Sequence, residues 1–324
     1  MPTLRRFRDG ILRPPDPARR AGKFALPLLL AGAVAIGFAP IFVRLSELGP
    51  TATAFHRLFL ALPVLWLWNA FEARSDRKTT GPKTRSDYAG LVVAGLFFAG
   101  DLGVWHWSIT FTSVANATLL ANFAPVFVAV AGFVLFGERF SRLFIVGMLV
   151  ALAGACVLMG RSFTMSSATL LGDALGLVTA AFYAGYIISV RRLRARLSTA
   201  TIMAWSGVVT CVALFPLAVW SGEDLIPTTL FGWLVLAGLA LFSHAGGQGL
   251  IAYALAHLPA AFSSVSLLLQ PAVAAVLAWV ILDEALGPYQ GLGAVMILAG
   301  IDLARRGSRG ASRRGATPSA ASKS

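Results

Sequence analysis

A single carboxylate stands out inside the long apolar stretches of this sequence. Asp101 is the only acidic residue well inside any of them. A charged side chain is costly within a bilayer and therefore suggests function by default, and desolvation disfavours its charged form. Asp101 is thus a candidate for binding and releasing a proton. The competing interpretation is structural, with Asp101 satisfied by a neighbouring helix or placed near a water-filled mouth.

Two residues that follow Asp101 could contribute to a binding site. Trp105 comes four residues later and shares its helical face, so it could form part of an aromatic wall. His106 could also bind a ligand or a proton, but it points roughly 140° away from Asp101 on a helix. The three residues therefore do not form one compact site by themselves.

Further polar and aromatic residues lie inside other apolar stretches. His244 and Gln248 share a helical face, and the glycines around them allow close helix packing. Serines and a glutamine form a polar stripe before Pro271, and two tyrosines share another face. The full set of predicted substrate-binding residues is Trp105, His106, Asn122, Tyr183, Tyr186, His244, Gln248, Ser263, Ser266 and Gln270.

Structural explanations compete with function for several of these residues. Serines in membrane helices often bond their own backbone carbonyls, which could account for Ser263 and Ser266. Asn122 could bond a carbonyl that Pro125 leaves free. The tyrosines could anchor a helix at the membrane interface, and helix packing alone could explain the glycine-rich segment around His244.

The elements that must position these residues are membrane-spanning helices. Hydrophobic residues make up 57% of the 324 residues and charged residues only 13%, whereas an ordinary globular domain has roughly 25% charged residues. A stretch of about 20 apolar residues can cross a bilayer as a helix, and backbone groups in lipid must be bonded within the segment. We therefore predict an all-α integral membrane protein with ten spans, at 24–46, 52–71, 88–108, 115–136, 142–160, 169–190, 199–220, 230–253, 260–282 and 288–304.

The basic residues indicate the orientation of these spans. If the N-terminus is cytoplasmic, 24 of the 27 Lys and Arg residues lie in the tails and cytoplasmic loops, so both termini face the cytoplasm. Segments 1–23 and 305–324 are then basic tails, the second of them disordered and resting against anionic lipid. The net charge of +13 thus reflects membrane orientation rather than binding to nucleic acid.

A few charged residues fall near the outer ends of the first two spans. We expect Arg44, His56 and Arg57 to extend to the outer surface or to pair with Glu47.

The two halves of the chain resemble each other at an offset of 146 residues. Pro125 then matches Pro271, and Gly147 matches Gly293. The predicted domains are a first repeat at 24–160 and a second at 161–304, each with five spans. Because five is odd, the two copies must cross the membrane in opposite directions. Inverted repeats are typical of secondary transporters, which bind substrate near the midplane between the halves, although duplication could also be only a simple way to build a bundle.

Short motifs in both halves resemble the drug/metabolite transporter superfamily, EamA type. They are GFAPIFVR at 37–44, RLF at 57–59 and the stretch from Thr112 through Pro125 to FGER at 136–139, with a second copy from Leu258 to Glu284. The resemblance covers residues 24 to about 304 and implies ten helices around a central cavity, which is lined mainly by spans 1, 3, 4, 6, 8 and 9. It also implies export of amino acids or related small metabolites, usually driven by proton exchange.

No enzyme motif accompanies these features. The sequence has no H-E-x-x-H zinc motif, no phosphate-binding loop and no G-x-S-x-G elbow, so we expect no enzyme, cofactor or metal. One alternative is an intramembrane enzyme that uses Ser243 or His244, but adjacent helical residues point about 100° apart. Another alternative is a passive channel.

The expected surroundings follow from this interpretation. We expect a multi-pass protein of a bacterial inner membrane whose partners are a small-molecule substrate and the lipid bilayer. A homodimer is compatible with the sequence, which does not determine the oligomeric state.

Overall fold

The computed structural model describes residues 17–75, 81–112, 114–159, 169–283 and 287–314, and the elements in these ranges are helices joined by turns. Within these described ranges, nine segments are long and apolar enough to cross a membrane: Phe24–Leu45, Pro50–Arg74, Arg85–Phe111, Asn116–Phe136, Arg142–Met159, Leu170–Leu193, Thr199–Trp220, Leu230–Ala254 and Ala260–Leu282. They agree with the first nine predicted spans to within three residues at each end. The prediction of these nine spans is therefore confirmed.

The tenth predicted span, 288–304, forms the first part of helix α16 (Pro288–Arg314). Its apolar stretch is short because Asp302 and Arg305 follow it closely, and α16 is not among the nine segments. The helix then continues through residues 305–314, so the prediction of a disordered tail beginning at 305 is wrong for these residues. Asp302 pairs with Arg306 at 2.7 Å, a spacing of four residues that supports a helix. Residues 315–324 lie outside the described ranges.

The N-terminal tail also begins to fold earlier than predicted. Helix α2 (Pro17–Gly37) starts within the segment 1–23 that was expected to be only a basic tail. The rest of this segment, 1–16, lies outside the part of the chain that the structure describes.

Four spans are interrupted at a proline. Proline has no N–H group and cannot bond the carbonyl four residues before it, so an α-helix tends to break there. The interruptions precede Pro40, Pro63, Pro125 and Pro271. They separate α2 from α3 (Ala39–Leu45), α4 (Pro50–Phe59) from α5 (Leu62–Ser75), α7 (Val114–Ala121) from α8 (Ala124–Phe136), and α14 (Ala260–Ser266) from α15 (Leu269–Leu282).

The other spans differ in regularity. Four are single helices: α6 (Arg85–Phe111), α9 (Arg142–Met159), α10 (Leu170–Leu193) and α11 (Thr199–Trp220). The eighth consists of α12 (Leu230–Ala237), a π-helical segment η2 (Gly238–Gln248) and α13 (Gly249–Ala254). Segments with this wider turn are uncommon and often occur at functional sites.

Helix α2 lies directly against η2. A Cβ atom added at Gly32 would come within 2.7 Å of the carbonyl oxygen of Gly247, so only glycine allows this approach. Close to this contact, the hydroxyl of Ser243 donates to the carbonyl of Ala35 at 2.8 Å. That carbonyl belongs to the last turn of α2, where backbone carbonyls have no N–H partner within the helix.

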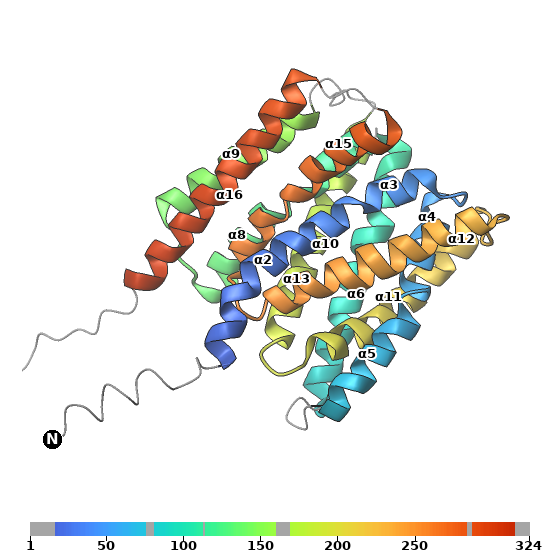
Figure 1. The fold of residues 1–324 in the computed structure, drawn as a ribbon, viewed down its shortest axis with the longest axis horizontal. Coiled ribbons are helices and arrows are strands. Elements are labelled where there is room, and N and C mark those ends of the chain that lie inside the picture. The colour runs from blue at the N-terminus through green and yellow to red at the C-terminus, as the bar shows by residue number, and fades with distance from the viewer. Residues whose placement is uncertain (1–16, 76–80, 113, 160–168, 284–286, 315–324) are drawn as a thin grey trace, which may run out of the picture.

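Helices α9 and α16 form a tightly packed pair at one side of the bundle (Figure 1). Glycines on both helices make the contact possible, because a Cβ atom at Gly147 or Gly300 would lie within 2.7 Å of the facing backbone. Gly147 faces Gly300, whereas Gly154, later in α9, faces the earlier Gly293. The two helices are therefore antiparallel.

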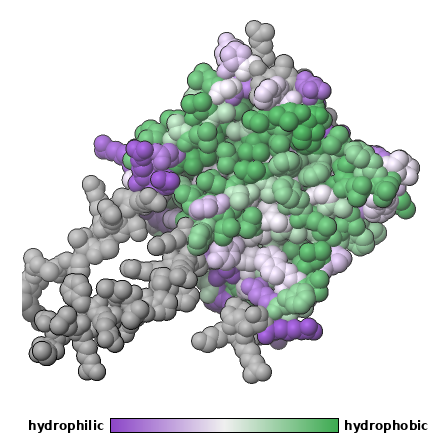
Figure 2. All heavy atoms as spheres, in the orientation of Figure 1, coloured by the Kyte–Doolittle hydropathy of each residue, from purple (hydrophilic) through white to green (hydrophobic). Residues whose placement is uncertain are grey.

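The surface suits a bilayer. Figure 2 shows a broad hydrophobic face with hydrophilic residues gathered toward its margins. Large apolar side chains such as Phe133, Val134 and Leu241 are exposed on the helices. Such a surface is favourable in lipid and would cause aggregation in water.

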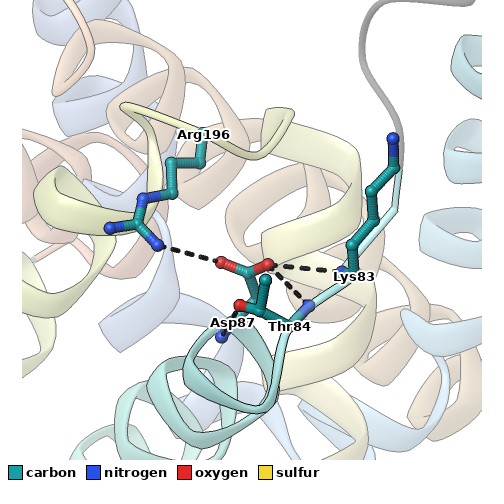
Figure 3. A network of polar contacts seen from close by, with 4 residues as sticks. All are labelled: Lys83, Thr84, Asp87 and Arg196. Carbon is teal, nitrogen blue, oxygen red and sulfur yellow. Dashed lines mark hydrogen bonds and ion pairs between the residues drawn. The ribbon is translucent and has the colours of Figure 1, made fainter.

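A polar network at the margin of this hydrophobic surface caps the N-terminus of helix α6. Thr84 and Asp87 form a reciprocal capping box, in which the side chain of Asp87 accepts from the backbone N–H of Thr84 at 3.0 Å. Arg196, just beyond α10, lies 3.6 Å from the same carboxylate (Figure 3). The network joins the start of the third span to the end of the sixth.

Candidate functional site

An aromatic stack crosses the interior between three spans. The ring of Phe98 in α6 lies 4.7 Å from the ring of Tyr186 in α10 and 5.5 Å from the imidazole of His244 in η2. Tyr183, one turn before Tyr186, continues the stack at 6.2 Å. Tyr186 and His244 are almost completely buried, with 1% and 2% of their surface exposed. These residues form an aromatic wall inside the bundle.

Amide side chains contact the stack at both tyrosines. Gln248, one turn after His244, interacts with Tyr186, and Gln270 at the start of α15 interacts with Tyr183. Gln270 directly precedes Pro271, where the ninth span is interrupted. The interruption therefore places a polar side chain at the stack.

Two opposite charges lie within electrostatic range of the same tyrosines. Asp101, one turn after Phe98 on α6, interacts electrostatically with Arg57 of α4, and both charges act on Tyr183. Both residues are partly accessible, and Asp101 lies well inside its span. We call Arg57, Phe98, Asp101, Tyr183, Tyr186, His244, Gln248 and Gln270 the central cluster.

The inward position of Arg57 corrects an expectation from the sequence. Arg57 does not extend to the outer surface or pair with Glu47, which instead accepts hydrogen bonds from Thr228 and Thr229. His56 is buried, and its Nδ1 bonds the carbonyl of Ala52 at 2.9 Å. The hydrophobic pattern placed Arg57 near a span end but could not show which way its side chain points.

Several buried polar atoms of the central cluster have no hydrogen-bond partner. They are Nε of Arg57, both ring nitrogens of His244, and Nε2 of Gln248 and of Gln270. Most buried polar groups in proteins are hydrogen-bonded, so unpaired groups gathered at one place need an explanation. They are the pattern expected of a binding site for a polar molecule.

Three other predicted binding residues, Ser266, Asn122 and Ser263, have no described contact with this cluster. The hydroxyl of Ser266 donates to the carbonyl of Phe262, four residues before it, which matches the structural alternative. Asn122 bonds the carbonyl of Thr118 rather than one that Pro125 leaves free. Ser263 is fully buried, with its hydroxyl unpaired.

Two predicted residues on α6 complete this comparison. Trp105 is partly buried one turn after Asp101. The side chain of His106 lies outside what the structure describes.

Two cavities lie away from the central cluster, near the end of α10. They have volumes of about 290 and 300 Å³ and share Arg191 as a lining residue. In the first, Arg191 forms an ion pair with Glu138 at 2.8 Å, and the guanidinium of Arg192 lies 4.4 Å from the ring centre of Phe136. Glu138 follows α8, so this ion pair connects the two halves of the chain.

The geometry does not favour hydrolysis or metal binding. Ser243 directs its hydroxyl to the carbonyl of Ala35, away from use as a nucleophile activated by His244. Within the described residues, no group of three or more His, Cys, Asp or Glu side chains could hold a metal ion.

Comparison with known proteins identifies the family. The EamA-like transporter family matches residues 23–160 and matches a second time at residues 170–305. The chain belongs to the EamA-like transporter family. This membership agrees with the resemblance to the drug/metabolite transporter superfamily seen in the motifs.

Curated relatives of this EamA-like chain are named as transporters or exporters. An uncharacterized transporter of Archaeoglobus fulgidus is 28% identical over 82% of this chain and 91% of its own length. A probable terminal-alkyne amino-acid exporter of Streptantibioticus cattleyicolor is 32% identical over 66% of this chain and 71% of its own. A pseudopaline exporter of Pseudomonas aeruginosa is 31% identical over 48% of this chain and 54% of its own length.

A solved structure shares the fold. It is described only as the crystal structure of a protein and is 16% identical, with a TM-score of 0.73 over 91% of this chain and 99% of that one.

The family match and the relatives named as transporters show what kind of protein this is. The EamA-like chain is a multi-pass membrane transporter of small molecules and not an enzyme.

Proposed function

We propose that this EamA-like protein is a secondary active transporter that exports amino acids or related small metabolites by alternating access. Its ten spans would form two inverted five-helix repeats in a bacterial inner membrane, with both termini in the cytoplasm. The two separate family matches support this architecture, as does the antiparallel packing of α9 and α16, the fifth and tenth spans.

The central cluster is the observation on which the substrate class rests. It combines an aromatic wall, two amide side chains and one pair of opposite charges deep between spans. A small zwitterion with a modestly apolar body matches this set. A nucleotide sugar would need several positively charged groups, and Arg57 is the one arginine or lysine in the cluster. Two relatives named as exporters support the direction of transport.

Transport can be tested by counterflow into proteoliposomes that contain the purified full chain. Amino acids, cationic drugs and nucleotide-like metabolites would be compared as substrates. We expect saturable counterflow for amino acids. A preference for nucleotide sugars would contradict the substrate class, and a flux without saturation or counterflow would indicate a passive channel instead.

Asp101 is proposed to couple this flux to protons. A carboxylate held between spans takes up a proton more readily than one in water, because desolvation disfavours its charged form. Asp101→Asn removes the proton site but keeps the shape of the side chain. We expect the variant to lose its response to an imposed pH gradient while it retains some exchange of substrate for substrate.

The control for this experiment is Asp224→Asn, which changes an exposed carboxylate in the segment before α12. It should respond to the pH gradient as the wild-type protein does. If Asp101→Asn also keeps the wild-type response, Asp101 has no role in coupling, which would then pass to the histidines.

A further inference from the structure

Most of the unpaired groups of the central cluster are hydrogen-bond donors. Arg57 Nε, Gln248 Nε2 and Gln270 Nε2 are hydrogen-bond donors and lack partners. His244 adds a further donor, because one of its two unpaired ring nitrogens carries a proton in either tautomer. All four side chains are joined through the tyrosine pair or the aromatic stack. Four of the five unpaired nitrogens are therefore donors, and the other ring nitrogen of His244 is the one acceptor among them.

A carboxylate is the group that best supplies acceptors for these donors. Its two oxygens can accept about four hydrogen bonds, and each bond gains strength from the negative charge. The positive charge of Arg57 favours an anion at the same place. Asp101 does not fill this role in the structure, since the amide nitrogens of Gln248 and Gln270 have no hydrogen-bond partner.

Asp101 offers the opposite complement. It is a partly accessible carboxylate that acts on Tyr183 from the third span, and it would attract an ammonium group. Tyr183 interacts electrostatically with both Asp101 and Arg57, so the two charged groups lie near the same part of the aromatic wall. A molecule that bears both an ammonium and a carboxylate group would satisfy both residues.

We infer that Arg57, with the amides of Gln248 and Gln270, binds the carboxylate of an α-amino acid, while Asp101 receives its ammonium group. The side chain of the amino acid then lies along the wall formed by Tyr183 and Tyr186. This inference rests on the proposed function and adds the residue that selects for the carboxylate. It assigns to Arg57 a direct contact with substrate.

The first test uses the wild-type protein and changes only the substrate. Counterflow of the common L-amino acids identifies the one transported best, which is then compared with its own carboxamide and with the acid that lacks its amino group. The carboxamide keeps the size of the amino acid but loses the negative charge. We expect it to compete about ten- to hundredfold more weakly, the loss that follows from removing hydrogen bonds between charged groups. The acid without the amino group should be weakened to a similar degree.

The second test changes the protein. Arg57→Gln should reduce the preference for the amino acid over its carboxamide to nearly none, whereas Arg57→Lys should keep part of it because the charge remains. Arg139→Gln is the matched control, since Arg139 is an exposed arginine of the loop before α9. It should keep the full wild-type preference.

The outcomes separate this inference from the proposed function. If the wild-type protein shows no counterflow with any amino acid, the proposed function fails and this inference fails with it. If amino acids are transported but the carboxamide competes equally well, only the role of Arg57 is contradicted. That comparison needs no variant, so it decides the question even if Arg57→Gln does not fold.

Discussion

Two glutamates connect the starts of α4 and α12 at one end of the bundle. Glu223 lies before α12 and accepts from the backbone N–H of Ala52 in α4 at 2.8 Å. Glu47 lies before α4 and accepts from the backbone N–H of Thr228, just before α12, at 2.8 Å and from the hydroxyl of Thr229. The first N–H groups of a helix have no internal partner and favour negative charge. Each carboxylate therefore holds the start of a helix from the other half of the chain.

This arrangement predicts a pH-dependent contribution of Glu47 to stability. The Thr229 hydroxyl and the nearby backbone N–H groups lower the pKa of Glu47 from its ordinary value of 4.5. Because the pKa is lowered in the folded state, the stabilisation is present above pH 4.5 and is lost as the pH falls through the lower, folded-state value. In thermal unfolding in detergent, the Glu47→Gln variant should have a lower melting temperature than the wild-type protein at neutral pH. This difference should disappear in acid.

Asp224→Asn provides the comparison for Glu47→Gln, because Asp224 is an exposed carboxylate of the loop that contains Glu223. We expect no such pH-dependent difference from it. If Glu47→Gln differs from the wild-type protein by the same amount at every pH, the charge of Glu47 does not carry the contact.

At the scale of the elements, the pairing of α9 with α16 depends on glycine. A Cβ atom at Gly300 would lie 2.4 Å from the backbone nitrogen of Ala151. Gly300→Ala must therefore separate the helices or strain the backbone, and overpacking of this kind costs about 1–3 kcal/mol. In thermal unfolding in detergent, Gly300→Ala should therefore have a lower melting temperature than the wild-type protein.

Gly291→Ala is the matched substitution on the same helix. A Cβ atom at Gly291 meets nothing within 4 Å. Alanine is the better helix former by about 0.5–1 kcal/mol, so this variant should be as stable as the wild-type protein or slightly more stable. Equal destabilisation by both variants would show that the close contact is not the cause.

At the scale of the whole molecule, the proposed inverted repeat predicts a definite topology. A reporter that is active only in the cytoplasm should be active when fused after Arg85, after Arg196 or at Ser324, and silent after Glu223. The reason is the distribution of Lys and Arg, which favours the cytoplasmic side of the membrane. Activity of the fusion after Glu223 would contradict the ten-span topology.

The apolar runs alone were enough to place nine spans to within a few residues. This is expected, because the thickness of a bilayer sets the length of a span and the backbone must bond within it. The interruptions at four prolines were not predicted, because proline does not always break a helix: Pro27 and Pro216 lie inside α2 and α11. The continuation of α16 to Arg314 was missed, because a basic composition does not distinguish a solvated helix from a disordered tail.

Only the tertiary structure decided which side chains meet. The sequence placed Asp101, Tyr183 and His244 in three separate spans but could not bring them to one aromatic wall, and it directed Arg57 outward. Hydropathy reports how far a segment extends along the membrane normal and says little about its rotation. Rotation is set by close contacts between helices, such as the approach of Gly32 to Gly247 that turns η2 toward α2. The position of Arg57 in the central cluster therefore became visible only when the helices were packed together.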